Sequence, residues 1–288
     1  MKVRIITDSA CDLPKEIIEE LDIEVLPLYV RLEGKEFKDC VEIEPKAVYE
    51  KMREGEFPTT AQISMPQFEE CFTKHAKEGN SCVYIAFSSG LSGTYNTSTI
   101  IEKQIKETYP DFNLTTIDSK CASMGFGLVV YKAARMAKEG ASKEEIVEKV
   151  RFYCEHMEHV FSVDSFETLV KGGRVSKTKG FIGTMLKIKP ILDVEDGKLI
   201  PLEKARGKGK ALKRLVELFG ERGVDLENQI IGISHGDDIE TALKAKEMIE
   251  SEYGVKEVII SYIGCAIGAH SGPGCLALFC LNEKQENY

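Results

Sequence analysis

The stretch that decides the fold is Ser81-Cys82-Val83-Tyr84-Ile85-Ala86-Phe87-Ser88-Ser89-Gly90-Leu91-Ser92-Gly93-Thr94. Its first half is a nearly continuous apolar run, which is typical of a strand covered on both faces in a parallel sheet. The Gly/Ser-rich turn that follows leads into a predicted helix over about 93–108. A buried strand, a turn and a helix in this order form the repeating unit of α/β proteins.

The same alternation extends in both directions along the chain. In the first half we predict strands at 3–7, 24–32 and 114–117, and helices from 14, 45 and 66 and over about 123–138 and 142–156. In the second half we predict strands at 160–163, 230–234, 258–262 and 276–281, helices from 208 and 239, and a hairpin of 188–194 with 198–202. Asp196-Gly197 supports the hairpin because Asp-Gly is a strong turn signal.

The order of predicted strands and helices changes near residue 160. This change predicts two α/β domains, as a chain of 288 residues usually requires. We place the N-terminal domain, with a mostly parallel sheet, at 1–160 and the second domain at 161–288. The final strand at 276–281 could belong to either sheet.

Composition and charge narrow the classes of function. The net charge of -9 argues against a nucleic-acid partner. Segment 171–214 is nevertheless basic, with 13 Lys or Arg against 4 Asp or Glu. This basic segment is either a solvated surface or a docking surface for an acidic partner or a phosphate. No apolar run is long enough to span a membrane and no secretory signal is evident, so a cytoplasmic protein is expected.

The nine cysteines indicate neither a disulfide framework nor a metal centre. Their number is odd, they are scattered, and no C-x-x-C pair occurs. Cys154, His156 and His159 fall near one another, but no second ligand cluster completes a site. We interpret these histidines as residues of a surface helix and expect no metal.

The turn after the central strand is suited to an anion. Ser92 can cap the following helix, and the free backbone N–H groups of Gly93 and Thr94 then point outward beside its hydroxyl. The glycines of the turn allow a ligand to approach the backbone closely. Plain helix capping would use the same residues, and capping is compatible with binding of a phosphate or carboxylate.

Two further segments could complete a site. The stretch 58–64 is predicted to be a polar loop that offers the Thr60 hydroxyl, and 269–274 is a Gly/Pro loop that carries His270. Ser92 and His270 also allow a second hypothesis, a serine-dependent acyl hydrolase or transferase. The sequence Gly90-Leu91-Ser92-Gly93 weakens it, because the second glycine of a nucleophile elbow would stand one position later. No phosphate-binding P-loop spacing is present.

Taken together, several segments resemble the DegV family. They are Asp8-Ser9-Ala10-Cys11-Asp12-Leu13-Pro14, Thr60-Ala61-Gln62-Ile63-Ser64, Ser88 to Tyr95, Gly172-Gly173-Arg174 and His270-Ser271-Gly272-Pro273-Gly274. They occur in the family's order over about residues 3–281. The chain departs from the family pattern at Ala61 and Ile63, which replace a serine and a proline.

The resemblance implies a protein that binds a long-chain fatty acid, such as palmitate, in a cleft between two domains. Thr60 and Ser92 would hold the carboxylate, with His270 nearby. The ligand-binding N–H groups of Gly93 and Thr94, expected from the turn itself, would lie beside Ser92. Arg174 would belong to a surface that docks a fatty acid kinase subunit. A protein of this kind presents its ligand and is not itself an enzyme, and it requires no cofactor. The length and unsaturation of the acyl chain do not follow from the sequence.

Overall fold

Four parallel strands form the first sheet of the protein. The computed structural model describes residues 2–176 and 188–284. In spatial order, the strands of this sheet are β2 (Glu24–Leu26), β1 (Arg4–Asp8), β6 (Cys82–Ala86) and β7 (Leu114–Asp118). All neighbouring pairs are parallel. The predicted parallel sheet is therefore confirmed, and its central strand β6 is buried along its whole length, as its apolar sequence requires.

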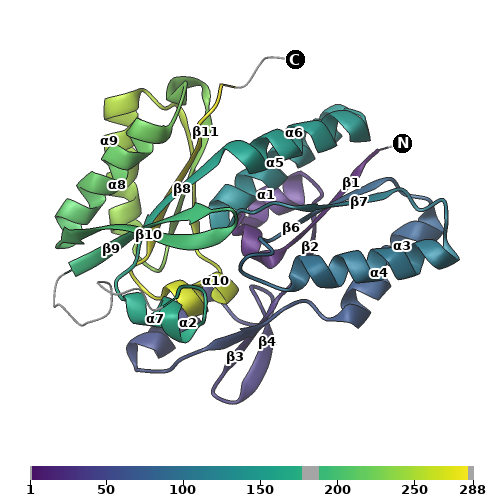
Figure 1. Cartoon of the computed structure of the whole chain (residues 1–288), viewed down its shortest axis with the longest axis horizontal. Helices are drawn as coiled ribbons and strands as arrows, with labels where there is room; N and C mark the ends of the chain where they lie inside the picture. Colours follow the sequence, from purple (N-terminus) through teal and green to yellow (C-terminus); the bar gives the residue numbers. More distant parts are fainter. Residues whose placement is uncertain (1, 177–187, 285–288) are drawn as a thin grey trace.

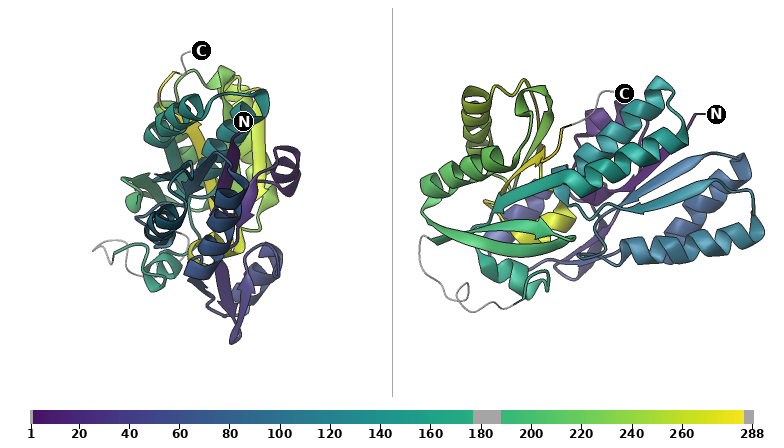
Figure 2. Two further views of the ribbon diagram at one scale, coloured as in Figure 1. Left: turned by 90° about the vertical axis from the view of Figure 1, so that its right-hand side faces the viewer. Right: turned by 45° about the horizontal axis from the view of Figure 1, so that its top comes forward.

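Helices cover both faces of this sheet. They are α1 (Lys15–Glu20), α3 (Met65–Glu78), α4 (Thr94–Thr108), α5 (Ser123–Glu139) and α6 (Lys143–His156), and a 3₁₀ turn spans Ser9–Cys11. Helices α3 and α4 pack together on one face, and α5 and α6 pack together on the other (Figure 1). The same layering is visible from two further directions (Figure 2).

The second sheet is larger and mostly antiparallel. Its strands, in spatial order, are β10 (Lys198–Arg206), β9 (Ile188–Glu195), β8 (Met157–Ser162), β13 (Leu276–Leu281), β11 (Ile230–His235) and β12 (Glu257–Tyr262). Among the described strands of this sheet, only the β11–β12 pair is parallel. Its helices are α7 (Phe166–Lys171), α8 (Lys208–Arg222), α9 (Ile239–Tyr253) and α10 (Cys265–Ser271), and a 3₁₀ turn spans Leu226–Asn228. The predicted hairpin is β9–β10.

Sheet membership gives a natural division of the chain. The predicted boundary between residues 160 and 161 cuts β8, all of which pairs within the second sheet. We therefore propose that the boundary lies before Met157. The final strand β13 pairs with β8 and β11, so it belongs to the second sheet and not to the first.

A small third sheet was not predicted. The stretch 24–32, expected to be one strand, is interrupted at Pro27, which has no N–H for a sheet ladder. The chain leaves the first sheet there and continues as β3 (Tyr29–Leu32), which pairs with β4 (Lys35–Lys38) and β5 (Thr59–Ala61). Helix α2 (Pro45–Arg53) lies between β4 and β5 in sequence. The expected polar loop at 58–64 is thus partly a strand, and Thr60 is its central residue.

Helix α5 joins the two large sheets. It packs against β1 of the first sheet and against β11 and β13 of the second. Its first eight residues are all buried, as expected for a helix covered on every side. Glycines allow this close packing, because a Cβ on Gly125 would lie 2.6 Å from His159 Nε2 and one on Gly127 2.4 Å from the Cys11 carbonyl oxygen. None of the described helices is long and apolar enough to cross a bilayer.

Candidate functional site

A cavity of about 190 Å³ lies between the two large sheets. Its wall is mainly apolar and comes from both halves of the chain; it includes Phe87, Phe161, Leu169, Leu199, Ala277 and Phe279. Phe87 directly follows β6, whereas Phe161 and Phe279 stand on the central strands of the second sheet. Such a cavity suits an apolar ligand of some length.

Polar groups from three separate elements meet at this cavity. Thr60 comes from β5, Ser92 and Gly93 from the turn before α4, and His270 from α10. Thr60 Oγ1 lies 2.8 Å from His270 Nε2. The structure therefore brings together segments separated by about 30 and about 180 residues, and each of these four predicted residues lines the cavity.

The turn before α4 differs in one detail from the expected cap. Gly93, not Ser92, is the N-cap residue, and α4 begins at Thr94. Ser92 Oγ still accepts a hydrogen bond from the Thr94 N–H, at 3.3 Å, and lies 2.9 Å from Thr94 Oγ1. Thr94 is buried and does not line the cavity, so its direct ligand role is not supported by the geometry. Its hydroxyl instead orients the hydroxyl of Ser92.

The Gly93 N–H and the start of α4 add donors to this turn. The first N–H groups of a helix lack intrahelical acceptors and carry partial positive charge. A Cβ on Gly93 would lie 2.0 Å from Gln62 Oε1, so only glycine leaves room for that side chain. Gln62 in turn donates from Nε2 to Thr97 Oγ1 at 2.8 Å and so ties β5 to α4. No pattern in the sequence signals this linking role of Gln62.

His270 lies in the last turn of α10, not in the loop that the sequence predicted. Burial, with the nearby charge of Arg174, lowers the pKa of His270 to about 4, so the imidazole is neutral at neutral pH. Its Nδ1 is buried and has no hydrogen-bond partner among the described residues. A Cβ on Gly172 would lie only 2.1 Å from this Nδ1. The first glycine of Gly-Gly-Arg therefore makes space for His270.

Carboxylates hold α10 in place. Asp12 Oδ1 accepts from the Gly264 N–H at 2.9 Å, and Asp39 Oδ1 accepts from the Ala266 N–H at 3.2 Å. Both carboxyl groups are buried, and desolvation raises the pKa of each. These contacts fix the start of the helix whose end carries His270, which explains how the Asp8–Pro14 segment contributes without lining the cavity.

Arg174 is a cavity residue in this structure. Its guanidinium donates to the carbonyl oxygens of Gly172, at 2.6 Å, and Leu91, at 3.2 Å. It is half-buried and lines the cavity, and desolvation lowers its pKa. A guanidinium in this position offers a cation to an anionic ligand. The expected role of Arg174 in docking a partner stays a prediction.

His159 is a second histidine of the cavity wall, and the surface-helix interpretation of it was wrong. It lies on β8 and is buried, because β8 is a central strand of the second sheet. Its Nε2 accepts from the Ala122 N–H at 3.1 Å, and its Nδ1 lies 3.0 Å from the Met157 carbonyl oxygen. These contacts fix the neutral tautomer, and burial lowers its pKa to about 4. A lone histidine in the sequence gives no signal for this position.

The pairing that an acyl hydrolase would need is not formed in the described part of the chain. Ser92 Oγ contacts Thr94, and His270 Nε2 contacts Thr60. No histidine or carboxylate within these residues forms a hydrogen bond with Ser92 Oγ that could activate it as a nucleophile.

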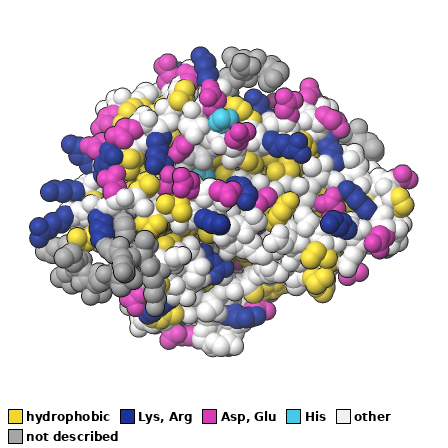
Figure 3. Space-filling view, viewed as in Figure 1, with side chains coloured by type: hydrophobic (Ala, Val, Ile, Leu, Met, Phe, Trp, Pro, Cys, Tyr) yellow, Lys and Arg dark blue, Asp and Glu magenta, His cyan; other side chains and the backbone are white. Residues whose placement is uncertain are grey.

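The basic segment lies on the second half of the protein. Lys and Arg side chains gather at the left of the face in Figure 3, where Figure 1 places α8 and the hairpin β9–β10. Lys208, Lys210 and Lys213 on α8 are exposed. Residues 177–187 of the segment lie outside the described residues.

The fold and site define a two-domain α/β protein with an apolar cavity that carries a polar, cationic cluster. A family model described as "Uncharacterised protein, DegV family" matches residues 2–283, so the chain belongs to the DegV family. A DegV domain-containing protein of Clostridium perfringens is 44% identical over 288 residues, which is 99% of both chains.

Two solved structures of similar fold are described as fatty-acid-binding proteins. The structure titled "Fatty Acid Binding of a DegV family Protein from Thermus thermophilus" matches with a TM-score of 0.88 and 29% identity, over 97% of this chain and 99% of that one. A "fat acid (stearic acid)-binding protein from Eubacterium ventriosum" also matches with a TM-score of 0.88, at 27% identity, over 96% and 98%.

Proposed function

We propose that this protein binds a long-chain fatty acid in the cavity, with the carboxylate held by Thr60, Ser92 and the N-terminus of α4. One observation carries the proposal: an otherwise apolar cavity gathers hydroxyl, amide, guanidinium and imidazole groups from four segments far apart in sequence. That division of polar and apolar wall matches a molecule with one anionic head and one long hydrocarbon tail.

The apolar wall and the polar end of the cavity contribute to binding in different ways. Each buried methylene contributes about 0.8 kcal/mol, so the tail of a fatty acid such as palmitate supplies most of the affinity. The carboxylate is costly to bury without partners. Hydroxyls and helix N–H groups satisfy its oxygens, and Arg174 supplies the positive charge that neutral His270 does not.

The related structures support this ligand class. The Thermus thermophilus protein and the Eubacterium ventriosum protein are described as binding a fatty acid and stearic acid, respectively. Both align over nearly the whole chain with a TM-score of 0.88, so they share its fold.

We further propose that the bound carboxylate is presented to a fatty acid kinase subunit, which would transfer a phosphoryl group from ATP to a carboxylate oxygen. The exposed lysines of α8 offer a docking surface of suitable charge for an acidic partner. Such a role requires no nucleophile or tuned base on this chain, and it places the protein in the cytoplasm.

Titration with palmitate tests the ligand proposal. Ser92→Ala should weaken binding, whereas the matched variant Ser89→Ala should not, because Ser89 Oγ engages Asp118 and does not line the cavity. Equal binding by wild type and Ser92→Ala would remove the assigned role of Ser92. Turnover of a chromogenic acyl ester that disappears in Ser92→Ala would instead support the hydrolase hypothesis.

A further inference from the structure

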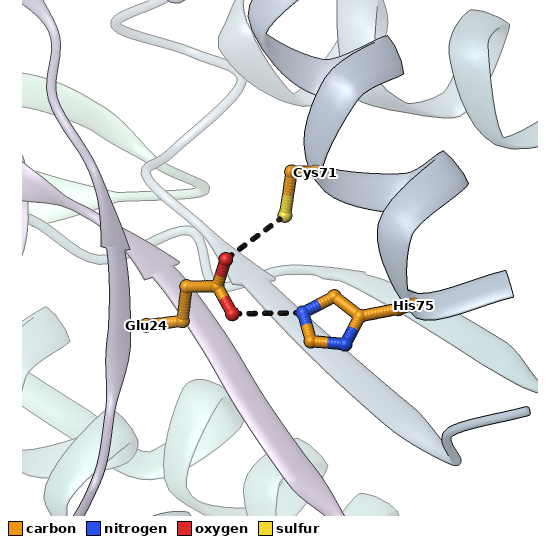
Figure 4. Close-up of side chains that lie close together, drawn as sticks. All are labelled: Glu24, Cys71 and His75. Atoms are coloured by element: carbon orange, nitrogen blue, oxygen red, sulfur yellow. Dashed lines mark hydrogen bonds and ion pairs between the residues drawn. The ribbon is translucent and has the colours of Figure 1, made fainter. Parts of the chain in front are cut away.

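Three side chains with metal-binding atoms converge at the edge of the first sheet, on residues that do not line the cavity. Cys71 and His75 stand one helical turn apart on α3 and both point toward Glu24 on β2 (Figure 4). Cys71 Sγ lies 3.7 Å from Glu24 Oε1, and His75 Nε2 lies 2.8 Å from Glu24 Oε2. One atom of each residue can be chosen so that all three lie within 4.8 Å of one another.

These separations are close to the edges of a zinc tetrahedron. With Zn–S near 2.3 Å and Zn–O and Zn–N near 2.1 Å, a tetrahedral angle places sulfur and oxygen about 3.6 Å apart and nitrogen and oxygen about 3.4 Å apart. The sulfur–oxygen separation, measured to Oε1, already fits. The short nitrogen–oxygen contact is to the other oxygen, Oε2, so a rotation of the partly buried Glu24 carboxylate must turn one oxygen toward both the sulfur and the nitrogen and open the latter contact by about 0.6 Å.

The second contact of His75 allows the tautomer that a metal requires. His75 Nδ1 lies 2.9 Å from the Asn80 side-chain amide nitrogen as placed, which leaves the hydrogen on Nε2 facing Glu24. Turning the Asn80 amide by 180° puts its oxygen there instead. The Glu78 carboxylate, which accepts from Asn80 Nδ2 at 2.8 Å, must then turn away into water, to which about half of its side chain is already exposed. Nδ1–H then donates to Asn80, and the Nε2 lone pair faces the cluster, as in histidines that ligate metals.

The charges also fit a divalent cation. Glu24 supplies a carboxylate, and Cys71 supplies a thiol that loses its proton when a cation binds, so the two together can neutralise a divalent ion. Lys74 Nζ lies 3.5 Å from Glu24 Oε1, but about half of that side chain is exposed, so it can move into water.

We propose that Glu24, Cys71 and His75 form a zinc site that links helix α3 to the edge strand β2. A carboxylate and a thiolate neutralise the two charges of the ion, and water occupies the fourth position. The mixed thiolate, imidazole and carboxylate set favours Zn²⁺ over Mg²⁺ or Ca²⁺. Binding would stabilise α3, whose first turn follows β5 and the cavity residue Thr60 within a few residues.

A second cluster provides an internal control. Asp39, Cys40 and Cys265 also lie close together. Their acceptors and donors are already occupied within the protein: Asp39 accepts from Ser9 and Ala266, and the Cys265 thiol donates to the Ile43 carbonyl oxygen. A metal there would disrupt the contacts that hold α10, so we assign no site to this cluster.

Cobalt titration of the reduced full-length protein tests the proposal. Wild type and Cys40→Ser should each bind one equivalent of Co²⁺ with a thiolate-to-cobalt charge-transfer band, and excess Zn²⁺ should displace it. The band should be lost in Cys71→Ser. Glu24→Gln changes the most exposed residue of the site, and it should weaken Zn²⁺ binding by at least the roughly 10- to 100-fold that changes around metal ligands cause.

Three results would overturn the zinc site: no band in wild type, a band retained in Cys71→Ser, or a band lost in Cys40→Ser. Melting in the presence of a chelator keeps the test independent of folding. Glu24→Gln should then melt below wild type because it loses the charged contacts with His75 and Lys74, whereas added Zn²⁺ should raise the melting temperature of wild type alone. Equal upward shifts in both proteins would also contradict the proposal.

Discussion

Replacing Thr60 with valine tests the polar end of the cavity with little change in shape. Valine is nearly isosteric with threonine and is well accepted in a strand, so β5 should persist. The change removes only the hydroxyl whose Oγ1 lies 2.8 Å from His270 Nε2. The variant therefore loses one donor to the fatty acid carboxylate and leaves His270 without that partner.

The expected loss follows from the charge of the acceptor. A hydrogen bond to a charged group contributes about 1.5–3 kcal/mol, which corresponds to a roughly 10- to 150-fold increase in the dissociation constant for palmitate. The neighbouring Thr59 is exposed on the same strand and does not line the cavity. Thr59→Val is thus a matched control that should bind palmitate as wild type does.

Isothermal titration of the delipidated proteins with palmitate measures this difference. A second titration with the corresponding long-chain alcohol separates the charged head from the tail, because Thr60→Val should cost less affinity for an uncharged ligand. The reasoning would be refuted if Thr60→Val bound palmitate within about twofold of wild type, or if Thr59→Val lost as much affinity.

Three other changes probe different parts of the site. Gly172→Ala places a methyl group 2.1 Å from His270 Nδ1, so it should displace the imidazole and weaken palmitate binding about tenfold or more; unchanged titration would contradict this. Ala277→Leu should fill part of the apolar wall and reduce affinity for an eighteen-carbon acid more than for a twelve-carbon acid, and an equal loss for both would argue against a tail site there. His159 has a folded pKa of about 4, below its ordinary 6.5, so its contribution to stability is present above pH 6.5 and is lost as pH falls toward 4. Urea unfolding should accordingly show that the stability difference between wild type and His159→Gln shrinks over that window; a difference that grows as pH falls would have the wrong sign.

Local sequence patterns predicted the alternating strands and helices well, because the burial of a strand and the geometry of a turn depend mainly on neighbouring residues. The apolar run at 81–87 is a buried parallel strand, and the Asp196-Gly197 turn closes a hairpin. The third sheet was missed because its pairing depends on Pro27, which diverts the chain, and on a short strand at Thr59–Ala61 that has no apolar periodicity.

The candidate site was predictable only in part. Ser92 and Gly93 stand out because a turn between a buried strand and a helix exposes N–H groups wherever it occurs. Thr60 and His270 were assigned to the site through the family resemblance, since nothing in their spacing along the chain shows that Thr60 Oγ1 and His270 Nε2 lie 2.8 Å apart. The cavity positions of His159 and Arg174 depend on how the second sheet packs, which no local pattern reveals.

The Glu24 cluster illustrates the same limit. Cys71 and His75 are one helical turn apart and could have been noticed together, but Glu24 is about 50 residues away on a strand. Parallel-sheet topology brings that strand beside α3, and only the folded chain displays the three groups as one constellation (Figure 4).

The most direct test of the central claim is mass spectrometry of an organic extract of the purified protein, with Ser92→Ala prepared in parallel. If the cavity holds a fatty acid, the wild-type extract should contain about one equivalent of a long-chain fatty acid and the variant extract clearly less. A folded wild-type protein that carries no fatty acid and takes up none when it is added would rule out the proposed ligand.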